Sequence, residues 1–155
     1  MHILMCNDDG ILADGLRQLA TYLSQYYRVT VVAPATEQSA KSHALTTEIP
    51  LKLDAYNGED ENPRLYALTG TPSDCMKFGL SYLLADDMPD LVISGINHGF
   101  NLGSDVLYSG TVSAAMESAF YGIPGLALSV ERYSIERGHE MHPFIHELIE
   151  KIYVN

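Results

Sequence analysis

The chain has 155 residues and a formal net charge of −11, with 46% hydrophobic and 19% charged residues. This length predicts one domain, residues 1–155, with a core of its own, and the composition excludes a chain disordered throughout. The acidic excess argues against a nucleic-acid polymer as partner, because phosphate backbones are bound by lysine and arginine. No apolar run approaches the roughly 18 residues of a membrane span, and the acidic start is unlike a secretory signal. We therefore expect a cytoplasmic protein without a membrane partner.

Short apolar runs alternate with amphipathic segments from the start of the chain. A strand is expected at 2–6, a helix at 14–26 with Asp14 as its cap, and a β-branched strand at 29–33. Strand, helix and strand within about 30 residues are typical of a parallel sheet with crossover helices. The first third of the chain therefore indicates an α/β protein.

The middle of the chain is less regular. Residues 45–53 alternate but contain Pro50, which favours an edge strand or a hairpin arm. Thr71 followed by Pro72 predicts a helix that begins there and runs to about Leu84. Further strands are expected at 65–68, 91–96 and 125–130, and further helices at 111–121 and 140–153. Together these elements predict an open, doubly wound α/β sheet.

A pair of acidic residues follows the first strand. In open parallel sheets ligands bind at the carboxyl ends of strands, and Asp8 and Asp9 stand at such an end. Two adjacent carboxylates are costly to bury unless a cation neutralises them, and a hard divalent ion such as Mg²⁺ or Mn²⁺ prefers oxygen ligands. The alternative is an ordinary polar turn, since Asn-Asp and Asp-Gly are common turn dipeptides.

Two other strands are also followed by polar groups. Asn97, after strand 91–96, offers a neutral amide oxygen beside glycines that allow close backbone approach. Ser39, in the loop after strand 29–33, adds a hydroxyl or is merely solvated. Because these strands would be neighbours of the first one, we expect their polar groups to converge with Asp8 and Asp9.

The predicted helix at 111–121 is preceded by small polar residues. Ser109, Gly110 and Thr111 would present free backbone N–H groups and two hydroxyls, which is the chemistry of a phosphate cradle. The alternative is simply a capped helix start. No lysine or arginine in these segments is placed to bind phosphate.

Taken together, these segments resemble the SurE family of survival proteins, metal-dependent 5′/3′-nucleotidases. The likeness extends over nearly residues 3–130 in the family's order and spacing. It rests on Asn7-Asp8-Asp9-Gly10, Val32-Ala33-Pro34 with Gln38-Ser39-Ala40, Gly70-Thr71-Pro72-Ser73-Asp74-Cys75, Ser94-Gly95-Ile96-Asn97-His98-Gly99-Phe100-Asn101-Leu102-Gly103 and Tyr108-Ser109-Gly110-Thr111-Val112. The resemblance implies a Rossmann-like, mostly parallel sheet in three αβα layers. It also implies hydrolysis of nucleoside 5′- or 3′-monophosphates, with short polyphosphate as a further substrate.

The resemblance also implies roles for single residues. The ligands of one Mg²⁺ or Mn²⁺ ion per subunit would be Asp8, Asp9, Ser39 and Asn97, and Asp8 or Asp9 would also be the catalytic carboxylate. The phosphate would lie among Asn101, Ser109, Gly110 and Thr111. His98 is a further candidate, either as a general acid or base or as a residue that only shapes the loop.

SurE proteins resemble one another over a longer stretch than this chain. We therefore expect it to lack the family's C-terminal strands and oligomerisation arm, which leaves one sheet edge open. The family forms homo-oligomers, dimers or tetramers, and a weaker homo-oligomer through that edge is expected here. Two alternatives to the nucleotidase stay open: a truncated, non-catalytic metal-binding chain that acts in binding or assembly, and a different metal-dependent hydrolase on the same sheet.

Two other residue groups carry no expected chemistry. Cys6 and Cys75 are too few for a disulfide scaffold and are expected as reduced core residues. His142 and His146 have the i, i+4 spacing of a zinc motif, but no third ligand is suitably placed in the sequence.

Overall fold

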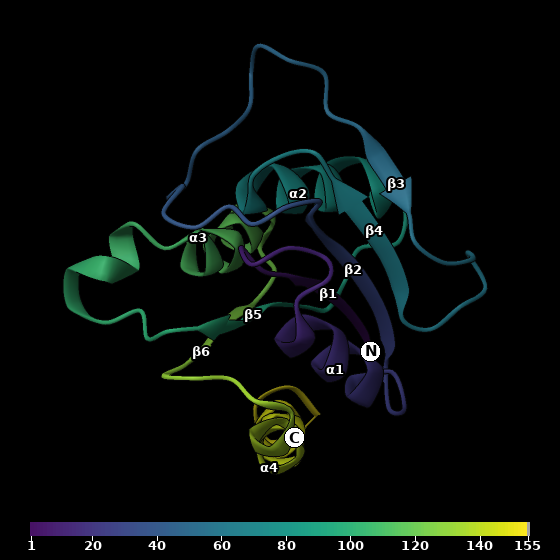
Figure 1. Ribbon diagram of the computed structural model, residues 1–155. Coiled ribbons are helices and arrows are strands. Elements are labelled where there is room, and N and C mark those ends of the chain that lie inside the picture. Colours follow the sequence, from purple (N-terminus) through teal and green to yellow (C-terminus); the bar gives the residue numbers. More distant parts are fainter. Residues whose placement is uncertain (155) are drawn as a thin grey trace.

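Residues 1–154 are described by a computed structural model, which contains a six-stranded sheet (Figure 1). The strands are His2–Cys6 (β1), Arg28–Pro34 (β2), Leu53–Ala55 (β3), Arg64–Leu68 (β4), Leu91–His98 (β5) and Gly125–Val130 (β6). Their spatial order is β3-β4-β2-β1-β5-β6, and every pairing is parallel except that of β3 with β4. The first strand of the chain thus lies inside the sheet, between β2 and β5.

Helices cover both faces of this sheet. The α-helices are Asp14–Leu23 (α1), Pro72–Phe78 (α2), Gly110–Glu117 (α3) and Ile135–Ile149 (α4). Short 3₁₀ or π-helical turns are Gly79–Leu83 (η1), Gly103–Leu107 (η2), Ser118–Tyr121 (η3) and Glu150–Val154 (η4). Figure 1 shows α1 and α4 below the sheet and α2 and α3 above it. This arrangement confirms the doubly wound, three-layer fold. None of the helices within residues 1–154 is long and apolar enough to cross a membrane.

Alternating side chains of each central strand enter two separate cores. In β1, Ile3 and Met5 pack in one core with residues of α1 and α4. Leu4 and Cys6 pack in the other with residues of α2 and α3. A strand covered on both faces has no polar face, which explains the unbroken apolar run at 2–6. Cys6 and Cys75 are free and buried, as expected.

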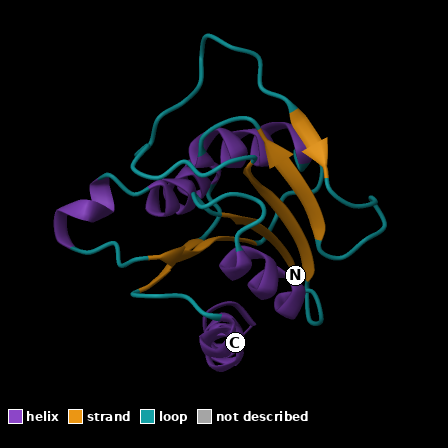
Figure 2. Ribbon diagram, in the orientation of Figure 1, coloured by secondary structure: helices purple, strands orange, loops and turns teal. Residues whose placement is uncertain are grey.

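The prediction of a strand over 45–53 is wrong for most of its length, because only Leu53 of this range lies in an edge strand. β3 is an antiparallel edge strand of three residues, and it begins only at Leu53. Residues 42–46 instead form hydrogen bonds with the layer of helices on one face of the sheet. For example, Thr71 Oγ1 donates to Ala44 O. In Figure 2 the loop between β2 and β3 arches over the helices of that face before it reaches the sheet.

Several predicted helix boundaries also differ from the structure. α1 ends at Leu23 instead of 26, and its N-cap is Ala13, so Asp14 is the first helical residue and not the cap. α4 begins at Ile135, five residues before the predicted start. The start of α2 is as predicted, with Thr71 at the N-cap and Pro72 in the first turn.

Candidate active site

The turn after β1 places the two aspartates at the edge of the sheet. Asn7 is fully buried, and its side chain holds this turn closed: Nδ2 donates to Gly10 O, and Oδ1 accepts from Gly10 N, both at 3.1 Å. Gly10 has a φ of 101°, which favours glycine. The polar turn that we weighed as an alternative is therefore present, and it is what presents Asp8 and Asp9.

Asp8 packs against the first turn of α3. Its Oδ1 accepts a hydrogen bond of 2.6 Å from the buried Thr111 hydroxyl, and only 6% of the residue is exposed. A Cβ at Gly110 would lie 2.9 Å from the Cβ of Asp8, so only glycine allows the helix to approach this closely. The Thr111 hydroxyl is thus directed at the carboxylate.

Asp9 is half-buried and lies beside a second negative charge. Burial of the side chain raises the pKa of Asp9 above its usual value, and the negative charge of the neighbouring Asp8 raises it further. Both effects disfavour an isolated carboxylate, so this position favours a cation as partner.

The end of β5 brings Asn97 and His98 to the same edge. β5 pairs with β1 in parallel, with Ser94 opposite Cys6, so Asn97 lies beside the turn that carries the aspartates. Asn97 Nδ2 donates to Gly99 O at 2.8 Å, so the amide oxygen is the atom that it can offer to a ligand. A Cβ at Gly95 would lie 2.3 Å from Leu128 O, which explains the glycine before this turn.

The other residues predicted at the site already have partners of their own. The exposed Ser39 donates to Glu37 Oε1 at 2.6 Å, and Asn101 Nδ2 donates to Ser129 Oγ at 2.7 Å. Ser109 Oγ accepts from Val112 N and caps α3, so the capped helix start that we weighed as an alternative is present. Phosphate contacts by Asn101, Ser109, Gly110 and Thr111 stay predictions.

A cleft of about 740 Å³ opens above these strand ends. It brings together most of the predicted site residues: Asp8, Asp9, Ser39, Asn97, His98, Asn101 and Ser109. Gly110 and Thr111 lie against Asp8 but do not themselves line the cleft. The rest of the lining consists of Ala13, Asp14, Gly15, Glu37, Ala40, Ile96, Phe100, Asp105, Tyr108 and Tyr133.

The cleft is strongly acidic. Of the described residues that line it, none is lysine or arginine, whereas five carry carboxylates: Asp8, Asp9, Asp14, Glu37 and Asp105. The sequence alone did not predict Asp14, Glu37 or Asp105 as residues of the cleft. Glu37 could have been found from its position two residues before Ser39, whereas the sequence pattern at Asp14 predicts only a helix cap.

The donor set of the cleft fits a hard divalent cation. Among the side chains that the structure describes, no group of three His, Cys, Asp or Glu is arranged to hold a metal. The predicted ligands are of another kind: two carboxylates, one hydroxyl and one amide oxygen, all on the same cleft. Oxygen donors of this mixture suit Mg²⁺ or Mn²⁺ better than zinc.

Comparison with known proteins places this geometry in a family. The family model described as "Survival protein SurE" matches residues 3–155. A "5′-nucleotidase SurE" of Thermoanaerobacter sp. (strain X514) is 51% identical over 152 residues, which are 98% of this chain and 60% of that protein. Another of Thermosipho africanus is 54% identical over 139 residues, or 88% of this chain and 52% of that protein.

A solved structure agrees with these sequence matches. The crystal structure of the SurE protein from Aquifex aeolicus has a TM-score of 0.85 and 40% identity, and covers 98% of this chain and 60% of its own. This chain thus spans about three fifths of the length of most of these relatives. Since the family model matches nearly every residue and relatives are about half identical, this chain belongs to the SurE family of survival proteins.

Proposed function

We propose that this chain acts as a divalent-metal-dependent phosphomonoesterase that hydrolyses nucleoside 5′- or 3′-monophosphates to nucleoside and phosphate. The observation that carries the proposal is the acidic cleft, which is lined by five carboxylates, two of them predicted ligands, and by no described lysine or arginine. A phosphate dianion enters such a cleft only together with a cation. The relatives named 5′-nucleotidase SurE support a nucleotide as the phosphate ester.

In this proposal Asp8, Asp9, Ser39 and Asn97 hold one Mg²⁺ or Mn²⁺ ion per subunit. When bound, the ion supplies Lewis-acid polarisation of the phosphoryl group and offsets the charge of the cleft. The 2.6 Å hydrogen bond from Thr111 fixes one oxygen of Asp8 and so sets the direction of its carboxylate. This contact is consistent with a ligand that must keep one orientation.

The same aspartates would also move protons, and the remaining residues would position the phosphate. One of the two aspartates accepts a proton from the water whose oxygen attacks phosphorus, while the ester P–O bond breaks and the nucleoside oxygen takes up a proton. His98, at the rim of the cleft, is a candidate donor of that proton. Free backbone N–H groups at the start of α3, with Asn101 and Ser109, would hold the non-bridging oxygens.

Aromatic side chains on the cleft support a nucleoside as the leaving group. Phe100 and Tyr108 line the cleft and are both exposed, so their rings are accessible to a base. Stacking of a base on an aromatic ring stabilises binding by about 1–3 kcal/mol. Short polyphosphate, which lacks a base, is a further substrate to be compared. Free, buried Cys6 and Cys75 fit the cytoplasmic location that we expect.

The proposal is tested by Asp9→Asn, which removes one charge and keeps the shape. We expect Mn²⁺ binding to be lost in calorimetry and phosphate release from AMP and GMP with Mn²⁺ to be lost with it, while the circular dichroism spectrum is unchanged. Asp86→Asn, at an exposed position away from the cleft, is the matched control and should behave as wild type.

The alternatives give different results in the same assays. Undiminished Mn²⁺ affinity in Asp9→Asn would contradict the metal site. A wild-type chain that binds Mn²⁺ but releases no phosphate from any nucleotide would favour the non-catalytic alternative. Faster turnover of phosphodiesters or sugar phosphates than of nucleotides would favour a different hydrolase.

A further inference from the structure

The segment of residues 37–46, which carries Ser39, is held mainly by polar contacts. Ser39, Ala40 and Lys41 are all exposed, so apolar burial contributes little to their position. Two residues that are not glycine have left-handed backbone conformations, Ala40 with φ 57° and Ser42 with φ 53°. Such conformations persist only where surrounding contacts determine them. The contacts at the two ends of the segment must therefore fix where Ser39 lies.

One end of the segment is bound to Asp8 itself; beyond Ser39 it is bound first to the chain before α3 and then to α2, where Thr46 donates to Asp74. Gln38 N donates to Asp8 O at 2.7 Å. Beyond Ser39, Ser42 N donates to Tyr108 O at 3.2 Å, and Ser42 Oγ donates to Leu107 O at 2.9 Å. Ser39 therefore lies between a contact with the aspartate turn and contacts with the chain that leads into α3.

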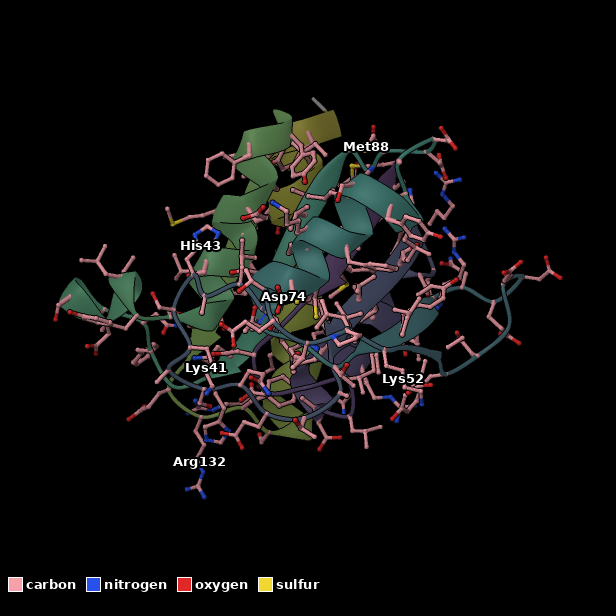
Figure 3. All side chains as sticks on the ribbon, turned by 90° about the horizontal axis from the view of Figure 1, so that it is seen from above. Lys41, His43, Lys52, Asp74, Met88 and Arg132 are labelled. Carbon is pink, nitrogen blue, oxygen red and sulfur yellow. The ribbon has the colours of Figure 1, made fainter. Side chains whose placement is uncertain are left out.

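The next residue, His43, makes a short hydrogen bond with a buried carboxylate. Its Nε2 donates to Oε2 of Glu117, the last residue of α3, at 2.6 Å. The Glu117 side chain is only 7% exposed and that of His43 32%. A buried carboxylate is costly without a hydrogen-bond donor, so each partner holds the other in place. Figure 3 shows His43 beside the green ribbon of α3, with Lys41 farther along the segment.

Helix α3 links this pair to the aspartates. At its first turn Thr111 donates to Asp8 Oδ1, and at its last residue Glu117 accepts from His43. One short rigid element therefore fixes both Asp8 and the segment that carries Ser39. We propose that His43 and Glu117 form a positioning pair, which sets the distance of Ser39 from Asp8 and thereby the affinity of the cleft for its cation. This inference rests on the proposed function in one respect: that Ser39 and Asp8 bind the same ion.

Hydrogen exchange without metal tests the pair independently of activity. In His43→Ala the amides of Gln38 and Ser42 should exchange about tenfold faster or more, as expected for loss of a hydrogen bond to a charged group. His43→Gln retains an N–H donor and should restore most of the protection. Glu117→Gln keeps an acceptor but loses the charge, and should lie between His43→Ala and wild type.

Calorimetry with Mn²⁺ alone connects the pair to the site. The Kd for Mn²⁺ should rise about tenfold in His43→Ala and recover in His43→Gln, which a general loss of stability would not reproduce. His146→Ala is the matched control: His146 likewise lies beside a carboxylate, 3.7 Å from an oxygen of Glu150, but does not line the cleft. It should change neither exchange at Gln38 and Ser42 nor Mn²⁺ affinity.

The outcomes separate this inference from the proposed function. Wild-type exchange at Gln38 and Ser42 in His43→Ala would overturn the positioning pair, as would faster exchange without any loss of Mn²⁺ affinity. A wild-type chain that binds no Mn²⁺ would refute the proposed metal site and the link to affinity, whereas the exchange data would still decide whether the pair holds the segment.

Discussion

The Thr111 hydroxyl is the partner that decides how Asp8 is oriented. Thr111→Val keeps the volume and leaves a buried carboxylate oxygen without its donor. We expect the free energy of unfolding to fall by about 1–3 kcal/mol, because the desolvation cost of Asp8 is no longer offset. Urea denaturation measures this change. Thr111→Ser keeps the hydroxyl and is the control; a Val variant as stable as the Ser variant would contradict the assignment.

Residues at strand ends could be predicted from the sequence, whereas their partners could not. Asp8 and Asn97 follow apolar strands, so the parallel topology alone predicts that they meet at one edge. The donor to Asp8 comes from Thr111, 103 positions away, and His43 pairs with Glu117 across 74. Neither contact follows from periodicity or spacing, because each depends on how a helix packs on the finished sheet.

At the scale of elements, Thr71 joins a helix to the loop that crosses it. Its Oγ1 accepts from Asp74 N at 3.1 Å and donates to Ala44 O at 2.6 Å. Thr71→Ala should lower the free energy of unfolding by about 1–2 kcal/mol through loss of the cap. Thermal unfolding measures the change, and Thr71→Ser should stay within a few tenths of wild type. Equal melting temperatures for the Ala and Ser variants would show that the cap is dispensable.

The elements that could not be predicted are those set by contacts with other elements. The alternation at 45–53 is that of a strand, but Thr46 N and Oγ1 both donate to the carboxylate of Asp74, so this part of the chain does not pair with the sheet. α4 begins early because Ser134 caps it, before the apolar face from which its start was predicted. By contrast, the apolar strand at 2–6 has its predicted bounds and that at 29–33 is longer by one residue at each end, because both faces of these strands are buried.

At the scale of the whole molecule, the sheet ends in a strand with one partner. Among the described strands β6 pairs with β5 alone, and several of its residues are exposed or half-buried. An edge of this kind favours pairing with a second chain. We expect a homodimer that dissociates on dilution, measured by light scattering over a concentration series. Ala127→Lys places a charge on this strand and should lower the dimer fraction. A monomer at every concentration would contradict the expectation.

The position of β1 has a consequence for folding kinetics. β1 has one of its two neighbours in β5, which follows it only after β2, β3 and β4, and the Asp8–Thr111 contact joins residues 103 positions apart. Contacts between such distant parts of a chain form slowly and late. Mn²⁺ should therefore slow unfolding while leaving the refolding rate nearly unchanged, because the transition state does not yet contain the completed cleft. Stopped-flow measurements with and without Mn²⁺ test this; a refolding rate that rises with Mn²⁺ concentration would show instead that the aspartate turn and α3 are already together when the chain crosses the barrier.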